Sequence, residues 1–402
     1  MKILHTADWH LGKRLDYYSR FEEQKLVMQE IIQIANHHNV DAVLIAGDLF
    51  DNFNPPIEAI ELFYTTLKEL TNNGKRPVIA IAGNHDSPDR IQSPDSLALL
   101  NGILFSGNPF HIINKLTIEN GFSITKTDNG FIELALTNGE LLRIIHTPFV
   151  NQQRIKIFID KENDESISTF LHTHWSTLAD KYCNNEGVNI LLTHALLPFD
   201  KNETITEPDN EKPIEFISEI LSAEIIPHQI DYVALGHLHR YQTNKTEHCT
   251  IAYSGSPVAY SFSEASQQKK IIIIEKTANT ALTLTPITIE NGKELKRKTF
   301  NSFDDAILWL KDNQEFLVEC TIKTDTYFKP GDLKELHDIH KGIISILPFI
   351  ENTENNDNTN TKKNIDLSKS RQELFIDYFR YKFAKEPNKE ILSLYKEIES
   401  LS

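Results

Sequence analysis

The sequence predicts an α/β protein whose main part has two layers of β-strands packed together and flanked by helices. A small α+β capping domain and a C-terminal helical tail are expected after it. Strand-type and helix-type patterns alternate through the first hundred residues, shorter apolar segments joined by turns follow, and a polar tract precedes a last amphipathic segment. The chain has 402 residues, too many for one compact core, which suggests two or three domains.

The first hundred residues have the order expected of a parallel sheet. Apolar runs over residues 2–6, 42–46 and 77–82 read as buried strands, and stretches with the helical spacing of apolar residues separate them. The second of these helices is expected to begin at Pro55-Pro56, because proline is favoured in the first turn. Alternation of this kind predicts a ligand site at the carboxyl ends of the strands.

From residue 103 onward the segments become shorter. Residues 121–126, 130–136 and 141–147 are separated by the turn sequences Asp128-Asn129-Gly130 and Asn138-Gly139, so they read as antiparallel hairpins. A first domain, residues 1–278, is completed by a helix near 166–180 and by strands at 188–193, 232–235, 250–254 and 270–275.

Three further parts are expected after this domain. Residues 279–350 read as a small α+β capping domain. Residues 351–365 are rich in Asn and almost free of apolar side chains, so they form a linker or loop. Residues 366–402 resume a helical pattern that breaks at Pro387, and they are too few for a core of their own, so they pack on the rest of the chain or on a partner. The apolar positions offered for partner binding are Leu374, Tyr378, Phe379, Ile391, Leu394 and Tyr395.

Composition and the N-terminus bear on location and partners. The net charge of −16 would repel a polyanion such as DNA, unless bound cations, a basic patch or a basic partner reverse it locally. Cys183, Cys249 and Cys320 show no C-x-x-C spacing, which favours structural thiols in a reducing compartment. Met1 opens directly into a strand, which leaves no room for a signal peptide, and no apolar run is long enough for a bilayer. A cytoplasmic protein without a membrane segment is expected.

Polar side chains stand where the apolar runs end, and this feature decides the class of function. Asp, His and Asn are poor strand formers, so at the ends of buried strands they indicate a site rather than a core. Carboxylate and imidazole groups in this number suit two divalent cations about 3.5–4 Å apart, the spacing used for in-line phosphoryl displacement. The expected metal ligands are Asp8, His10, Asp48, Asn84, His194, His237 and His239.

Local geometry adds detail to this expectation. Alternate residues of a strand point to the same side, so Asp8 and His10 can reach one ion together, as can the His-x-His pair that ends a later strand, if the terminal turns stay extended. Asp48 is the candidate for bridging both ions with its two oxygens. Gly47 and Gly83 precede ligands, where the lack of a side chain lets backbone and ion approach closely.

The amino-acid sequences of four motifs resemble those of a known family. The four stretches are His5-Thr6-Ala7-Asp8-Trp9-His10-Leu11-Gly12, Gly47-Asp48-Leu49-Phe50-Asp51, Ala82-Gly83-Asn84-His85-Asp86-Ser87 and Tyr253-Ser254-Gly255-Ser256-Pro257. They closely resemble the motifs of the calcineurin-like metallophosphoesterase superfamily and, within it, of the double-strand-break-repair nucleases. The resemblance covers essentially the whole chain, including a capping domain and a helical tail.

The resemblance implies how the ligands divide between two ions. The first ion would be held by Asp8, His10, Asp48 and His239. The second ion would be held by Asp48, Asn84, His194 and His237. Manganese is the metal that this family prefers, and imidazole with carboxylate and no thiolate fits Mn, Fe or Zn better than Mg or Ca.

His85 is expected to be catalytic rather than a ligand. It adjoins Asn84 and would point toward the scissile phosphate, where it stabilises the transition state or protonates the leaving oxygen. Asp51 or Asp86 would orient its ring through a carboxylate hydrogen bond.

For the function, the resemblance implies a metal-dependent DNA nuclease with 3'-5' double-strand exonuclease and hairpin endonuclease activities in DNA recombination, replication and repair. It would act on double-stranded DNA ends and hairpins, as a homodimer within a heterotetramer with an SMC-like coiled-coil ATPase. The sequence has no Walker A loop, so ATP dependence must come from that partner. The alternatives are a stand-alone metallophosphodiesterase or phosphatase acting on small molecules, and a metal-stabilised scaffold without turnover.

Overall fold

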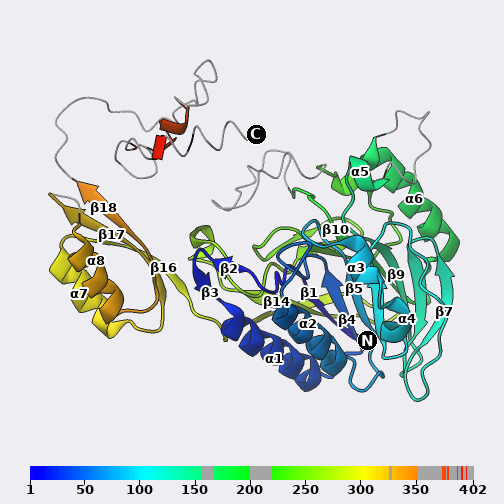
Figure 1. Cartoon of the computed structure of the whole chain (residues 1–402). Coiled ribbons are helices and arrows are strands. Elements are labelled where there is room, and N and C mark those ends of the chain that lie inside the picture. Colours follow the sequence, from blue (N-terminus) through cyan, green and yellow to red (C-terminus); the bar gives the residue numbers. More distant parts are fainter. Residues whose placement is uncertain are drawn as a thin grey trace. The chain divides into compact units, whose positions relative to one another are not determined.

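The computed structural model describes residues 1–155, 166–199, 220–325 and 328–350, together with residues 374–376, 378–379, 387, 391–392 and 395 of the tail. The chain divides into two compact units, Met1–Glu351 and Asn352–Ser402. Figure 1 shows the first unit as sheets covered by helices.

The first sheet has six strands in the order β15-β14-β1-β4-β5-β6. Strands β1, β4, β5 and β6 are parallel to one another, as the alternation of strands and helices predicts. Strands β14 and β15 join antiparallel at one edge. The strands are β1 (Lys2–Thr6), β4 (Ala42–Ala46), β5 (Val78–Ile81), β6 (Ile103–Ser106), β14 (Lys270–Glu275) and β15 (Thr283–Thr288).

The second sheet has seven strands in the order β12-β13-β11-β10-β9-β8-β7. The antiparallel order of β7, β8 and β9 agrees with the hairpins expected from the turn sequences, and β9, β10, β11 and β13 are parallel to one another. The strands are β7 (Ser123–Asp128), β8 (Phe131–Ala135), β9 (Leu141–Thr147), β10 (Val188–His194), β11 (Tyr232–Gly236), β12 (Gln242–Lys245) and β13 (Thr250–Tyr253).

The two sheets pack face to face, which confirms the predicted two-layered architecture. Alternate residues of each strand enter different cores: Leu44 of β4 and Leu192 of β10 lie between the sheets, whereas Val43 faces the helices. Helices α1 (Phe21–His37) and α2 (Ile57–Leu70) pack on the outer face of the six-stranded sheet.

The outer face of the seven-stranded sheet is covered by α6 (Ile167–Tyr182), which buries Leu171 and Trp175 against it. Ser166 caps this helix by accepting a hydrogen bond from the backbone N–H of Thr169. The short elements of this unit are β2 (Arg14–Leu15), β3 (Tyr18–Ser19), α3 (Pro88–Gln92), α4 (Asp95–Leu99), α5 (Gln152–Ile155) and the 3-10 turns η2 (Ala223–Ile225) and η3 (Phe262–Glu264).

After β15 the chain forms a three-stranded sheet with two helices, in the strand order β16-β17-β18. Its elements are β16 (Leu295–Phe300), α7 (Phe303–Asp312), β17 (Leu317–Thr324), α8 (Pro330–Ile339) and β18 (Ile343–Ile350). The boundary expected between residues 278 and 279 falls inside the six-stranded sheet, because β15 pairs with β14 along its whole length. The three-stranded sheet therefore begins at Leu295, and turn signals alone do not show which strand β15 joins. We refer to residues 295–350 by the name expected from the sequence, the capping part.

In the tail, the ring of Phe375 stacks on that of Tyr395, with centroids 4.3 Å apart. The two short helical segments therefore contact each other. Leu394 and the Asn-rich stretch 351–365 lie outside the described residues. Among the helices that are described, none is long and apolar enough to cross a membrane.

Candidate metal centre

The expected ligands come together because the parallel strands of both sheets end at one place. Asp48 follows β4, His194 is the last residue of β10, and His237 follows β11. Nδ1 of His194 donates to the backbone carbonyl of Ala46 at 2.8 Å, and the backbone N–H of His237 donates to Oδ1 of Asp8 at 2.9 Å. These two bonds join the end of one sheet to the end of the other.

The backbone at the strand ends is not extended. Asp8, His10, Asp48 and His237 have φ angles of 53°, 43°, 48° and 105°, so all four lie in the left-handed region. Such a conformation costs a residue with a side chain roughly 1–3 kcal/mol and is typical of functional sites. The expectation that Asp8 and His10 share one side required extended backbone at the strand end, and the backbone there is not extended. A turn of the backbone directs both side chains into the centre instead.

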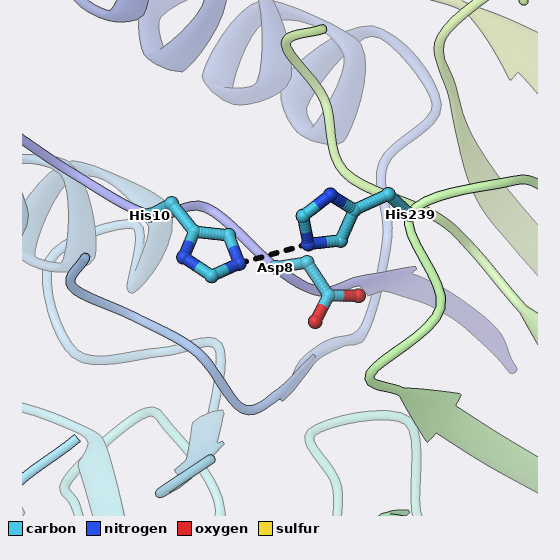
Figure 2. Close-up of side chains that lie close together, drawn as sticks. All are labelled: Asp8, His10 and His239. Carbon is cyan, nitrogen blue, oxygen red and sulfur yellow. Dashed lines mark hydrogen bonds between the residues drawn. The ribbon is translucent and has the colours of Figure 1, made fainter. Parts of the chain in front are cut away.

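Asp8, His10 and His239 form a first cluster, shown in Figure 2. One ligand atom from each residue lies within 4.8 Å of the other two, and all three residues are buried. Nε2 of His10 and Nε2 of His239 face each other at 2.9 Å. Within the described part of the chain, Oδ2 of Asp8 is buried without a hydrogen-bond partner. A buried carboxylate oxygen with this unmet need is what a cation would satisfy.

Asp48, His194 and His237 form a second cluster, again with ligand atoms within 4.8 Å of one another. The side-chain oxygen of Asn84 lies 2.9 Å from Nε2 of His194 and 3.0 Å from Nδ1 of His237. His237 and His239 therefore belong to different clusters, unlike the pair that strand alternation suggests. Left-handed backbone at His237 separates their directions.

Asp48 lies between the two clusters. Its Oδ2 is 3.4 Å from Nε2 of His194 in the second cluster and 3.6 Å from Nε2 of His10 in the first. Its Oδ1 accepts the backbone N–H of His85 at 2.9 Å. One carboxylate oxygen thus faces imidazoles of both clusters, the position that a residue bridging two cations must have.

Gly47 and Gly83 leave room for ligand side chains rather than for an ion. A Cβ atom on Gly47, whose φ is 88°, would lie 2.3 Å from Nδ1 of His194. A Cβ atom on Gly83 would lie 2.1 Å from Oδ1 of Asp48. Both glycines are therefore required by the close approach of the neighbouring strand-end loops.

Burial and mutual charge shift the pKa values in the centre. Burial raises the pKa of Asp8 to about 7, and burial lowers that of His237 to about 3. Burial alone would also raise the pKa of Asp48, but the charges of His194 and His85 hold it well below its usual range. Burial likewise opposes the charge on His194, yet the carboxylates of Asp48 and Asp8 raise its pKa to about 9.

The donor set fits two divalent cations. It consists of carboxylate and amide oxygens and imidazole nitrogens, the ligands of Mn, Fe and Zn, and it contains no thiolate. The two clusters share the carboxylate between them, as dinuclear phosphoesterase centres require.

His85 lies at the edge of the centre, half-buried, with its ring edge-on to that of His10. Its Nδ1 donates to the backbone carbonyl of Asp51 at 2.7 Å, so Nδ1 carries the proton. The sequence suggests a carboxylate from Asp51 or Asp86 for this role, but the structure uses the peptide carbonyl of Asp51. A side-chain pattern cannot reveal such a partner.

The Asp86 carboxylate has a different place. It accepts the backbone N–H groups of Gly83 at 2.8 Å and of Leu49 and Phe50 at 3.0 Å. It therefore ties the loop that carries Asp48 to the loop that carries Asn84, whereas Nδ1 of His85 is bonded to the carbonyl of Asp51.

Two residues near the centre carry no signal in the sequence. Arg154 of α5 donates to the backbone carbonyls of Gly83 and Asp86, each at 3.0 Å, and so holds the loop of His85. Glu264 of η3 has Oε1 3.6 Å from Nδ1 of His239. Burial would raise the pKa of Glu264, but the charge of Lys269 and the contact with His239 hold it well below its usual range. Both residues act over long sequence distances and belong to no short motif.

Comparisons with known proteins agree with this geometry. The family model described as calcineurin-like phosphoesterase matches residues 1–241. A Bacillus subtilis (strain 168) protein named as the SbcD subunit of the nuclease SbcCD is 34% identical over 363 residues, which cover 87% of this chain and 86% of that protein. A protein of the same name from Staphylococcus epidermidis is 30% identical over 74% of this chain and 71% of its own length.

Among solved structures, a dimetal phosphatase from Danio rerio is similar over 72% of this chain and 98% of its own, with 10% identity and a TM-score of 0.41. At that level of similarity it carries no argument about function.

Proposed function

This chain belongs to the SbcD family of calcineurin-like phosphoesterases, and on that premise we propose that it cleaves double-stranded DNA at its two carboxylate–histidine clusters. As a member of this family it is a metal-dependent nuclease, a hydrolase of phosphodiester bonds. The observation that carries the proposal is the place of Asp48, whose single carboxylate faces imidazoles of both clusters.

We assign the ligands to two Mn²⁺ ions. The first ion is held by Asp8, His10, Asp48 and His239. The second ion is held by Asp48, Asn84, His194 and His237. When bound, the pair neutralises phosphate charge and lowers the pKa of a water molecule that serves as the nucleophile. Two observations support this assignment. Nε2 of His10 and Nε2 of His239 lie 2.9 Å apart. Oδ2 of Asp8 is buried and has no hydrogen-bond partner within the described part of the chain.

His85 supplies the proton chemistry in this proposal. Because Nδ1 is engaged with the carbonyl of Asp51, Nε2 is the ring nitrogen left to meet substrate. A protonated His85 can donate to the leaving sugar oxygen or to a phosphate oxygen in the transition state. Its half-buried position beside His10 and Asp48 supports this role.

The partner in this proposal is SbcC, an SMC-like coiled-coil ATPase that supplies ATP hydrolysis. Together they would form a heterotetramer around a homodimer of this chain and act in the cytoplasm on DNA ends and hairpins, with 3'-5' exonuclease and hairpin endonuclease activities. The tail is the part assigned to the partner. Tyr378 is exposed there, although Phe379 is buried within the described part of the chain. Deleting residues 366–402 should abolish co-purification with SbcC and leave metal binding intact.

A substrate assay separates this proposal from a phosphodiesterase acting on small molecules. The chain with SbcC, ATP and Mn²⁺ should degrade linear duplex DNA, and omission of any one of the three should lower the rate. Hydrolysis of bis-p-nitrophenyl phosphate is expected for both functions and does not distinguish them. If duplex DNA stayed intact while small diesters were hydrolysed, the DNA assignment would be wrong.

A further inference from the structure

The two ring nitrogens of His239 face different groups. Nε2 faces the first cluster, 2.9 Å from Nε2 of His10. Nδ1 points away from Asp8 and His10 in Figure 2 and lies 3.6 Å from Oε1 of Glu264. A metal-binding imidazole coordinates through one nitrogen and commonly donates the N–H of the other to a carboxylate or carbonyl. At His239 the carboxylate of Glu264 lies on that second nitrogen's side of the ring, at ion-pair rather than hydrogen-bond distance.

The carboxylate of Glu264 is held firmly in this place. The residue is 2% exposed, Oε1 accepts the backbone N–H of Tyr260 at 3.1 Å, and Oε2 forms an ion pair with Lys269. The Lys269 ammonium also donates to the backbone carbonyl of His239 at 3.1 Å. A buried carboxylate is costly unless a cation compensates it, and Lys269 supplies that compensation. The pair therefore contacts His239 at both its ring and its backbone.

The second cluster is supported differently. Nδ1 of His194 donates to the neutral peptide carbonyl of Ala46 at 2.8 Å. A carboxylate is a stronger acceptor than a peptide carbonyl and makes the imidazole a better ligand. The two clusters thus differ in the charge placed behind a histidine.

We propose that Glu264 is a positioning residue for the first cluster. Its carboxylate, 3.6 Å from Nδ1 of His239, attracts a proton to that nitrogen, favours the tautomer whose Nε2 faces Asp8 and His10, and strengthens the binding of a divalent cation there. The proposal rests on the proposed function in so far as the clusters hold cations. Glu264 touches neither substrate nor cation in this role.

The test is a calorimetric titration of the full chain with Mn²⁺ alone. Glu264→Gln keeps the shape of the side chain and removes its charge. We expect this variant to bind one of two ions about 10- to 100-fold more weakly and the other within about threefold of wild type. The matched control is Glu133→Gln, because Glu133 is also 2% exposed and is paired with Arg143 and Lys126 far from the clusters. That control should lower the melting temperature and keep both affinities.

The outcomes distinguish a failure of the proposed function from a failure of the role of Glu264. A wild-type chain that binds fewer than two ions would contradict the proposed function itself. Two ions bound by wild type, with unchanged affinities in Glu264→Gln, would overturn only the role of Glu264. That role would likewise be overturned if Glu264→Gln and Glu133→Gln weakened both ions equally, since Glu264 would then be merely structural.

Loss of the charge of Glu264 leaves Lys269 unpaired, and this variant could fail to fold. The double variant Glu264→Gln/Lys269→Gln removes both charges. A folded double variant should still show one weakened ion. Wild-type affinity in that variant would overturn the proposal.

Discussion

The strand-end loops of the metal centre and the capping part obey different rules. In the centre, Asp8, Asp48 and His237 adopt left-handed backbone and bury polar groups. In the described residues of the capping part, 295–325 and 328–350, no residue other than glycine has a positive φ. There Ser302 caps α7 by accepting the backbone N–H of Asp305, and the Asp332 side chain, at the third position of α8, accepts the backbone N–H of Lys329. Left-handed backbone combined with buried polar side chains marks the site, whereas ordinary helix caps mark a scaffold.

Replacing one aspartate in each region should give the largest difference between the two regions. Asp48→Ala removes the carboxylate between the two clusters, so binding of both ions and cleavage of DNA should be lost. Asp332→Ala removes a hydrogen bond to the backbone of Lys329 and should cost on the order of 1 kcal/mol of stability without changing activity. Metal titration, a nuclease assay and urea unfolding report these effects. Equal effects on activity would show that the regions do not differ.

A pair of histidine variants should also affect the two regions differently. His85→Ala should lower turnover roughly 10²- to 10⁴-fold and keep both ions, because His85 acts on substrate rather than as a ligand. His340 is buried in the capping part, where Nε2 donates to the carbonyl of Asn313 at 2.9 Å. His340→Ala should lower stability and leave turnover per folded molecule unchanged. Cleavage by His85→Ala at the wild-type rate would remove His85 from the mechanism.

Two glycines give opposite expectations. Gly47→Ala places a Cβ atom 2.3 Å from Nδ1 of His194 at a φ of 88°, so it should cost about 2 kcal/mol or more and weaken the second cluster. Gly331 lies in the first turn of α8, and a Cβ atom there meets nothing within 4 Å. Gly331→Ala should therefore stabilise the chain by about 0.5–1 kcal/mol. Thermal unfolding of both variants measures the difference, and destabilisation by Gly331→Ala would contradict the contrast.

A further prediction concerns the pH dependence of stability. Burial lowers the pKa of His5 and of His146 to about 3, whereas an unfolded histidine has a pKa near 6.5. Between these values the unfolded chain binds a proton that the folded chain does not. Stability should therefore fall as pH falls from about 6.5 toward 3, by roughly 1.4 kcal/mol per pH unit for each histidine.

Urea unfolding of metal-free protein at several pH values between 4 and 7 checks this slope. His146→Gln should lower the slope of stability against pH by roughly 1.4 kcal/mol per pH unit, the contribution of one histidine. An unchanged slope would mean that His146 is not the neutral buried group described here.

The sequence predicts the layers of the fold well, because apolar period and turn residues are local signals. It also names the residues that meet at the strand ends, since parallel strands bring their carboxyl ends together. The sequence does not predict the backbone conformation of those residues or the direction of their side chains. The alternation rule for Asp8 and His10 assumes extended backbone, but both residues have left-handed backbone, and their N–H groups donate to the backbone carbonyls of Gly47 and Asp48 in the neighbouring loop.

Contacts between residues far apart in the sequence are the other feature that the sequence does not predict. Glu264 stands 25 positions beyond His239, and the carbonyl that holds His85 belongs to a peptide rather than to a side chain. The register of β15 depends on β14, which a boundary at residue 278 separates from it. Such features follow from tertiary contacts, and composition or periodicity carries no trace of them.

The nuclease function proposed for this chain depends on two cations that occupy the strand-end centre and share Asp48. Crystals grown with Mn²⁺ and measured near the manganese absorption edge would locate these ions. Two anomalous peaks are expected, one among Asp8, His10 and His239 and the other among Asn84, His194 and His237, with the Asp48 carboxylate between them. A single peak, or two peaks away from Asp48, would contradict the shared centre.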